Sequence, residues 1–321
     1  MSYYLYTNIF GCFVLDEQGT IIEKQEFKSV EEYKKKEIAE NKLLKRYPQL
    51  TALPLENASL ILKQFREQKF FPEFYTRNML LTKEAVKHSV AEDQLIIQAI
   101  ANVNELDKVC NILVKRLREW YSLYLPELSE EISSNEKFAS LVAEKERAEI
   151  LEDLRLTEEE SMGLPLEQKY VREMKELSFR IRTLYSLRQE HELYLEEVMK
   201  RYCPNFLELA GVTIGARLIE LGRGLKHLAL LPASTIQLLG AEKALFRHIK
   251  TGSRPPKYGV IFSHQLIQKA KGSERGKISR VLADKLSLCA RLDYFKGEFK
   301  APEYKKGLEE RFGKQKHEPA N

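Results

Sequence analysis

The sequence predicts a mainly α-helical protein with a small N-terminal α/β domain, a long antiparallel coiled-coil hairpin and an all-helical C-terminal domain. Three observations support this fold class. Runs of β-branched and aromatic residues open the chain, heptad-like apolar spacing dominates its middle, and short apolar segments rich in small residues fill its last third. The changes in pattern divide the chain into 1–90, the N-terminal α/β domain; 91–126, a connecting helix; 127–200, the coiled-coil arm; 201–295, the C-terminal domain; and 296–321, a charged tail that we expect to fray.

A β-hairpin is predicted at the start of the chain. Residues 3–15 and 20–27 are rich in β-branched and aromatic residues, and an Asp-Glu-Gln-Gly turn separates them. A single Lys/Glu-rich helix is predicted over residues 29–46, with Ser29 as N-cap and Glu32 completing a capping box. A dense aromatic cluster follows, which is typical of a hydrophobic core and, alternatively, of a surface for a partner protein. Its members are Phe65, Phe70, Phe71, Phe74 and Tyr75.

The middle of the chain predicts long helices. Residues 93–124 contain neither Gly nor Pro, residues 128–156 predict a second helix, and Gly163 and Pro165 mark a hairpin tip. The first helix has apolar residues at spacings of three and four: Ile96, Ile100, Val103, Leu106, Val109, Leu113 and Leu117. The return helix has the alternating steps of four and three of a coiled-coil seam: Tyr170, Met174, Leu177, Ile181, Leu184, Arg188, His191, Leu195 and Val198.

Because a helix of roughly 30 residues is unstable alone in water, the return helix needs a partner surface. We expect two antiparallel helices within residues 127–199 to supply part of that surface, and self-association to supply the rest. The polar seam residues Arg188 and His191 either specify register or mark the point where the seam frays. The residues predicted to support a dimer are Met174, Leu177, Ile181, Leu184 and Leu195.

The two parts of the chain carry opposite charge. Residues 200–321 contain 24 Lys and Arg residues against 11 Asp and Glu residues, which leaves a net charge of +13. Residues 1–199 contain 28 basic against 36 acidic residues, a net charge of −8. The C-terminal excess is typical of a protein that binds a polyanion, and nucleic acid is favoured over a membrane because no basic amphipathic helix with a continuous apolar face stands out. A solvated basic surface is the alternative.

Residues 232–248 combine helix punctuation, adjacent apolar side chains and cations. Pro232 starts a short helix that ends near Gly240, and a second helix begins at Glu242. On that helix Phe246 lies about 100° from Leu245, so one core cannot readily bury both. We interpret the pair, with the neighbouring cations, as a surface that stacks on bases and contacts phosphates. The alternative is an ordinary amphipathic helix.

Further basic residues surround this stretch. A loop stiffened by two prolines presents Arg254 and Lys257, and a predicted helix over residues 273–292 carries Lys277 and Arg280 on its outer face. The sequence Gly-Arg223-Gly suggests a nucleotide-binding loop only superficially, because no strand precedes it and no dinucleotide or P-loop pattern is complete.

No catalytic or metal-binding pattern is present. The four cysteines are about a hundred residues apart, and the six histidines are scattered without a metal-binding spacing or an orienting acid. No apolar run approaches the roughly 20 residues that span a bilayer, and the first residues lack the basic region of a signal peptide. We therefore expect an intracellular, soluble protein without cofactor, metal, membrane association or enzymatic activity.

Several segments together resemble the Nop domain family. They are Pro-Ala-Ser-Thr-Ile-Gln from residue 232, Leu-Gly-Ala-Glu-Lys-Ala-Leu-Phe-Arg over 239–247, Pro-Lys-Tyr-Gly-Val-Ile-Phe over 256–262, Gly-Lys-Ile-Ser-Arg over 276–280 and Arg-Glu-Trp-Tyr over 118–121. The absence of a long Lys/Glu-rich tail is similar to the archaeal branch of this family. One departure is that Ser263 precedes His264, where relatives show the opposite order.

The resemblance implies a scaffold of box C/D guide ribonucleoproteins, cytoplasmic in archaea and nucleolar in eukaryotes. It implies that the N-terminal domain binds fibrillarin, the methyltransferase that uses S-adenosylmethionine, that the coiled coil forms a homodimer, and that the Nop domain binds a kink-turn guide RNA carrying a small ribosomal-type protein. The expected RNA-binding residues are Arg223, Glu242, Lys243, Ala244, Leu245, Phe246, Arg247, Lys250, Arg254, Lys257, His264, Lys277 and Arg280. The alternatives are a coiled-coil adaptor that binds only proteins through its basic domain, and an RNA methyltransferase in its own right.

Overall fold

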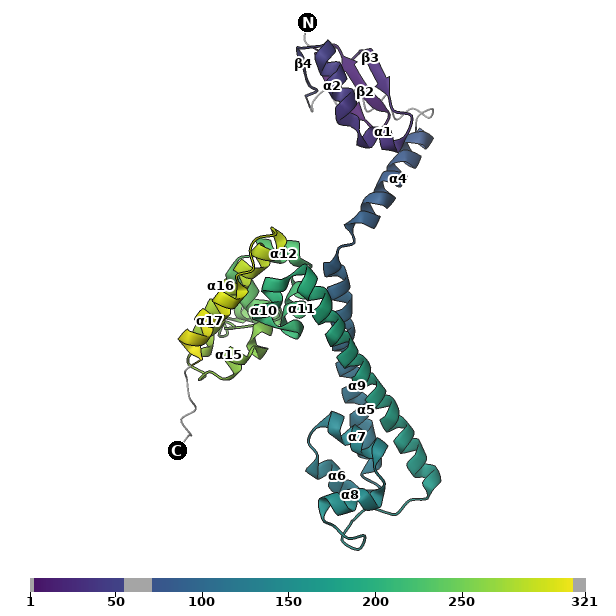
Figure 1. The fold of residues 1–321 in the computed structure, drawn as a ribbon, viewed down its shortest axis with the longest axis vertical. Coiled ribbons are helices and arrows are strands. Elements are labelled where there is room, and N and C mark those ends of the chain that lie inside the picture. The colour runs from purple at the N-terminus through teal and green to yellow at the C-terminus, as the bar shows by residue number, and fades with distance from the viewer. Residues whose placement is uncertain (1–2, 55–70, 314–321) are drawn as a thin grey trace. The chain divides into compact units, whose positions relative to one another are not determined.

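A computed structural model describes residues 3–54 and 71–313 of the chain, which form two compact units, Met1–Ala91 and Glu92–Asn321 (Figure 1). The chain has the mainly α-helical fold class that the sequence predicts, with one small sheet in the first unit. None of the helices within the described ranges combines the length and the apolar character that a membrane span requires.

The first unit contains a four-stranded sheet with the order β3-β2-β1-β4. Strands β1 and β2 pair antiparallel, as do β2 and β3, whereas β4 runs parallel to β1. Apolar side chains cover both faces of the sheet: Cys12, Val14 and Leu50 pack with α2 on one face, and Phe13 and Leu15 belong to a second cluster. The elements are β1 (Tyr3–Asn8), β2 (Gly11–Leu15), β3 (Ile21–Glu26), α1 (Val30–Lys34), α2 (Lys36–Arg46), β4 (Leu50–Ala52) and α4 (Phe71–Ser89).

Two predictions for this unit were wrong in detail. Residues 3–15 form two strands because the chain reverses before Gly11, where an added Cβ would lie 2.3 Å from the carbonyl oxygen of Gln25. The helix predicted over 29–46 is interrupted at Lys35, although Ser29 caps its first part as expected, accepting a hydrogen bond from the Glu32 amide.

The aromatic cluster is partly buried. Phe74 packs against Phe10 with ring centroids 5.9 Å apart, whereas Phe71 and Tyr75 are exposed and stack on each other. Phe65 and Phe70 lie outside the described residues.

The second unit begins with an arm in which two long helices lie side by side (Figure 1). Arg188 of α9 forms an ion pair with Asp107 of α5 at 2.5 Å, and His191 lies 3.4 Å from Asn102. Rising numbers on α9 therefore meet falling numbers on α5, so the two helices are antiparallel, and Arg188 and His191 contribute to register through polar contacts with α5. The arm contains α5 (Glu92–Tyr121), α6 (Pro126–Glu131), α7 (Asn135–Glu144), α8 (Arg147–Leu154) and α9 (Gln168–Tyr202).

The partner of α9 differs from the prediction. Residues 128–156 form parts of three short helices instead of one, because Ser134 caps α7 and Glu146 starts α8 with a capping box. Helix α9 packs mainly along α5, and only α7 of the short helices makes an extensive second contact with it. The coiled-coil hairpin is thus formed by α5 and α9, and the short helices pack beside it.

The buried faces of both long helices also differ slightly from the predicted ones. On α5 the stripe passes through Cys110 and Val114, while Val109 is exposed. On α9 Met174, Ile181 and Leu195 have no exposed surface because they pack in the chain's own core, so they cannot contact a second copy. The predicted dimerisation set is wrong for these three residues, and the other two, Leu177 and Leu184, are half-buried.

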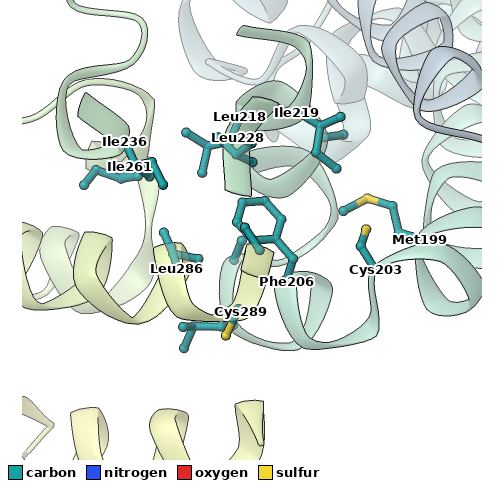
Figure 2. Close-up of a cluster of buried hydrophobic side chains, with 14 of the residues drawn as sticks. Met199, Cys203, Phe206, Leu218, Ile219, Leu228, Ile236, Ile261, Leu286 and Cys289 are labelled. Carbon is teal, nitrogen blue, oxygen red and sulfur yellow. The ribbon is translucent and has the colours of Figure 1, made fainter. Parts of the chain in front are cut away.

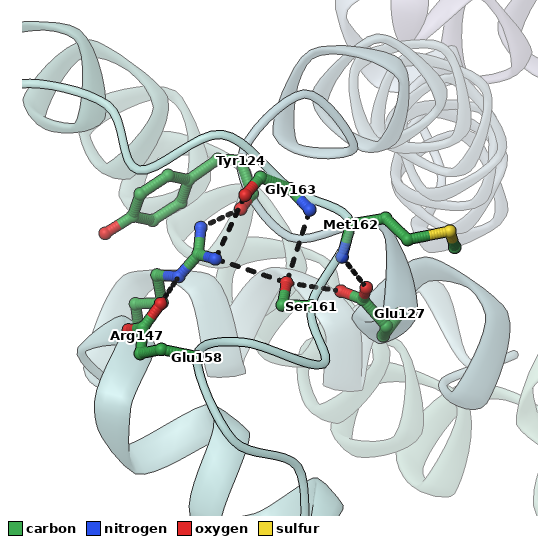
Figure 3. A network of polar contacts seen from close by, with 7 residues as sticks. All are labelled: Tyr124, Glu127, Arg147, Glu158, Ser161, Met162 and Gly163. Carbon is green, nitrogen blue, oxygen red and sulfur yellow. Dashed lines mark hydrogen bonds and ion pairs between the residues drawn. The ribbon is translucent and has the colours of Figure 1, made fainter.

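The loop that joins α8 to α9 is held by a buried arginine (Figure 3). The Arg147 guanidinium is 6% exposed, donates to the carbonyl oxygens of Tyr124 and Gly163 and to Ser161 Oγ, and forms an ion pair with Glu158. At Gly163 an added Cβ would lie 2.1 Å from the Tyr124 carbonyl oxygen, so any other residue would displace the loop. The tip is therefore a fixed structure.

A helical core completes the second unit. Phe206 lies at its centre with Met199, Cys203, Leu218 and Cys289 around it (Figure 2). The elements are α10 (Pro204–Ala210), α11 (Val212–Leu221), α12 (Leu225–Leu230), α13 (Ala233–Leu238), α14 (Glu242–Thr251), the 3-10 helix η1 (Val260–Ser263), α15 (Gln265–Gln268), α16 (Arg275–Tyr294) and α17 (Ala301–Phe312).

The expectation that the tail from residue 296 frays was wrong for its first part. Helix α17 packs on α10 and α16, and it buries Ala301, Leu308 and Phe312 in the core. Residues 314–321 lie outside the described residues. The helical core of this unit therefore extends to residue 313.

Candidate nucleic-acid interface

Helix α14 buries none of its ten residues. Phe246 is 65% exposed and Ile249 is 73% exposed, while Leu245 is half-buried. The sequence predicts that one of Leu245 and Phe246 is hard to bury, and the structure leaves neither in the core. Exposed side chains of this size on one short helix are typical of a surface that binds a partner.

A glycine and a side-chain hydrogen bond lie at each end of α14. Gly240 has a φ of +86°, and an added Cβ there would lie 2.5 Å from Val260, so the break before the helix needs glycine. The Glu242 carboxylate accepts a hydrogen bond from the Gly240 amide at 2.7 Å. At the other end Gly252 adopts a left-handed conformation, and the His248 ring donates to the Ser253 carbonyl oxygen. The helix is therefore oriented without burying its own side chains.

The loop after α14 is anchored to α13. The amides of Gly259 and Val260 donate to the carbonyl oxygens of Gln237 and Leu239, each at 2.8 Å. The Gln237 side chain donates to the Lys257 carbonyl oxygen at 2.6 Å. Arg254 and Lys257 are exposed on this loop. The hydrogen bonds to α13 fix the end of the loop that carries them.

The cations of this region are unpaired. All are exposed, and none forms an ion pair with any residue in the described ranges: Lys243, Arg247, Lys250, Arg254 and Lys257. In the arm, by contrast, acidic neighbours pair the cations, as in Arg182 with Glu144. Unpaired cations around exposed apolar side chains can neutralise phosphates while a ring stacks on a base.

The N-terminal turn of α16 adjoins the same loop. An added Cβ at Gly276 would lie 3.4 Å from Cδ of Lys257, so the Lys257 side chain lies over this turn. Lys277 and Arg280 are exposed on α16, as predicted. Arg223 is exposed in the loop between α11 and α12 with a φ of +57°.

His264 does not fit the role of a stacking residue. Its Nε2 lies 3.1 Å from the Leu209 carbonyl oxygen, and its Nδ1 accepts a hydrogen bond from the Leu266 amide at the start of α15. Burial lowers the pKa of the imidazole, which therefore stays neutral and serves as a helix cap. This candidate binding residue is structural, and its order relative to Ser263 does not alter that.

Ile249 is an exposed residue of this helix that was not predicted from the sequence as part of the binding surface. It follows Phe246 by three residues and therefore lies near it on the helix surface. That spacing was the signal that could have found it. In the described part of the chain no group of three or more His, Cys, Asp or Glu residues is arranged to hold a metal ion.

Comparisons with known proteins identify the family. Residues 102–314 match the family model described as Nop, "snoRNA binding domain, fibrillarin". An uncharacterised NOP5 family protein of Methanocaldococcus jannaschii is 42% identical over 246 residues, which cover 72% of this chain and 59% of that protein. Nucleolar protein 56 of Schizosaccharomyces pombe is 38% identical over 234 residues, or 67% of this chain and 47% of that protein.

The chain spans about half the length of the curated relatives it matches. A crystal structure of a fibrillarin/Nop5p complex aligns over 97% of this chain and all of that one, but with a TM-score of 0.44 and 24% identity it is too distant to carry detail across. The family match covers the arm from residue 102 onward and the helical core that positions α14. The chain belongs to the Nop family.

Proposed function

We propose that this protein is a non-catalytic scaffold of a box C/D guide ribonucleoprotein and that α14 with its following loop binds the RNA. The observation that carries the proposal is a helix with no buried residue, whose exposed Phe246 and Ile249 lie among unpaired cations. The description of the family as a snoRNA-binding domain supports RNA as the ligand.

The chemistry of the surface supports contact with an unpaired base beside a backbone. A phenyl ring stacks on any nucleobase, so Phe246 suits a base that is turned out of a helix. Arg247 and Lys243 flank Phe246 and are exposed, so both can reach phosphates on either side of that base. A kink-turn offers such bases together with closely spaced phosphates.

The two units are proposed to bind different partners. We propose that the first unit binds fibrillarin and that the second unit recognises the kink-turn RNA together with a small ribosomal-type protein. The family description names fibrillarin, but its match over residues 102–314 does not extend to the first unit. In this arrangement the methyl donor belongs to fibrillarin. The isolated chain is expected to transfer no methyl group from S-adenosylmethionine to RNA.

A reconstitution with components omitted in turn tests this function. The chain should shift a kink-turn RNA that carries its small protein more strongly than either component alone, and the affinity should fall steeply as salt rises. Fibrillarin should join the complex through this chain. An adaptor that binds only proteins would instead bind the small protein equally well without RNA, and that result would refute the proposal.

We also propose that the arm forms a homodimer, through residues other than those first predicted. Large apolar side chains remain exposed on both long helices, notably Ile112 at 69% and Leu193 at 67%. A second copy that covered them would bury apolar surface that the chain itself leaves in water.

Substituting Glu at either position is expected to convert the dimer into a monomer. Neither side chain is buried in the chain's own core, so the monomeric variants should keep the helical content of the wild type by circular dichroism. Analytical ultracentrifugation of Ile112→Glu and Leu193→Glu measures the change. Lys306→Glu on the exposed side of α17, away from the arm, is a control for added charge, and dimers in both Ile112→Glu and Leu193→Glu would exclude this surface.

A further inference from the structure

A groove lies between α13, α16 and α17, apart from α14, and its wall combines apolar side chains such as Val281 with charged and polar ones. It has a volume of about 440 Å³ and is lined by cations from two helices, Arg280 and Lys285 of α16 and Arg311 of α17. Ser234 and Gln237 of α13 contribute a hydroxyl and an amide to its wall. The groove thus contains side chains that donate hydrogen bonds to anionic oxygens.

Most of this positive charge is not neutralised by the protein. Neither Arg280 nor Arg311 forms an ion pair within the part of the chain that the structure describes. Lys285 lies 3.4 Å from Asp284 and 5.2 Å from the centre of the Tyr304 ring. The lining of the groove therefore contains three cations and one carboxylate, Asp284.

The groove adjoins the loop that follows α14. Gln237, which lines the groove, donates to the carbonyl oxygen of Lys257 in that loop. Along α16 the basic residues run from Lys277 to Lys285, about 12 Å at 1.5 Å per residue. Because phosphates on one strand of a duplex follow one another at roughly 3.4 Å along the axis, this length spans more than one phosphate.

We propose that this groove binds the sugar-phosphate backbone of an RNA strand that continues from the segment held by α14. The proposal rests on the RNA-binding function proposed above and extends it to Lys285 and Arg311. The lining favours a backbone over an acidic protein, because it offers guanidinium, hydroxyl and amide groups but no aromatic residue to anchor a protein partner. Contacts of this kind position a strand without reading its sequence.

The test compares Arg311→Ala with Lys306→Ala. Both residues are exposed on α17, but only Arg311 lines the groove, so the pair is matched for charge and for helix. The probes are a kink-turn RNA with a flanking duplex and the same RNA without it, each bound to the small kink-turn protein. Affinities are measured over a range of salt concentrations, and circular dichroism verifies that each variant folds.

Arg311→Ala should reduce the slope of log K against log salt by about 0.9 on the longer RNA, as expected for one lost phosphate contact, and should leave binding of the shorter RNA unchanged. Lys306→Ala should change neither. Equal slopes for the two variants on the longer RNA would overturn the groove assignment while leaving the α14 site intact. The groove assignment would also be overturned if Arg311→Ala weakened only the binding of the chain to the small protein in the absence of RNA. Failure of the wild type to bind either RNA would overturn both proposals.

Discussion

The double variant Phe246→Ala/Arg247→Ala is expected to lose most of its affinity for kink-turn RNA while it keeps the thermal stability of the wild type. Stacking of one base on an aromatic ring contributes about 1–3 kcal/mol, which is roughly a 5- to 150-fold change in the dissociation constant. Loss of the Arg247 charge should also reduce the salt dependence by about one phosphate contact. Because α14 buries no side chain and alanine favours helix, folding should not suffer.

The matched control is Leu230→Ala/Lys306→Ala. Leu230 is 64% exposed on α12 and Lys306 is exposed on α17, so the control removes one large apolar side chain and one charge from other parts of the same unit. Gel shifts give the affinity and calorimetry gives the melting temperature. Equal affinity of the two double variants would exclude α14 as the binding site.

The elements around α14 could be predicted because local residues determine them. Pro232 precedes α13, Gly240 breaks the chain at a positive φ, and Gly252 ends α14 in a left-handed conformation. These effects depend on a residue and its neighbours along the chain. The exposure of Phe246 was also predictable, because two adjacent large apolar residues on one helix cannot both face the same core.

The partner of α9 could not be predicted, because a periodic apolar stripe shows that a helix face is covered and not what covers it. The stripe of α9 is covered by α5 along the arm, with α7 adding a second surface around Ser178, whose hydroxyl donates to the Ala139 carbonyl oxygen. That second neighbour widens the buried face beyond a two-helix seam, which is why Val171 is buried while Tyr170, the predicted seam residue, is 49% exposed.

Helix α17 was missed because its composition conceals its pattern. The segment is rich in charged residues and contains Pro302, yet Ala301, Tyr304, Leu308 and Phe312 recur at spacings of three and four. Pro302 lies in the first turn, where a proline favours a helix start. The role of His264 could not be predicted either, since its hydrogen-bond partner Leu209 lies 55 residues earlier in the chain.

The substitution Asp293→Ala is expected to cause a large loss of stability in the second unit. The Asp293 carboxylate is 4% exposed and accepts hydrogen bonds from the Asn205 amide, the Asn205 side chain and the Phe206 amide at the start of α10. In turn Asn205 Oδ1 accepts from the Lys300 and Ala301 amides, so the pair fixes the starts of both α10 and α17. Leaving a buried donor unpaired costs about 1–3 kcal/mol, so the free energy of unfolding should fall by about 3 kcal/mol or more.

Chemical denaturation of the wild type, Asp293→Ala and the control Asp284→Ala measures this loss. Asp284 is exposed on the same helix, and its removal should change the free energy of unfolding by less than about 0.5 kcal/mol. Similar values for the two variants would show that the Asp293 hydrogen bonds do not hold α10 and α17 in place.

The effect of Asp293→Ala should also depend on pH. Burial raises the pKa of Asp293 above its ordinary value, against hydrogen bonds from Asn205 and Phe206 that lower it. The native state therefore binds the Asp293 proton more tightly than the unfolded state does. The stabilisation that comes from this tighter binding is fully present below the pKa of the unfolded state, and it is lost as the pH rises through the pKa of the native state. The difference in unfolding free energy between the wild type and Asp293→Ala should shrink as pH rises across that window, and a difference that grows would mean that the hydrogen bonds to the ionised carboxylate outweigh its burial.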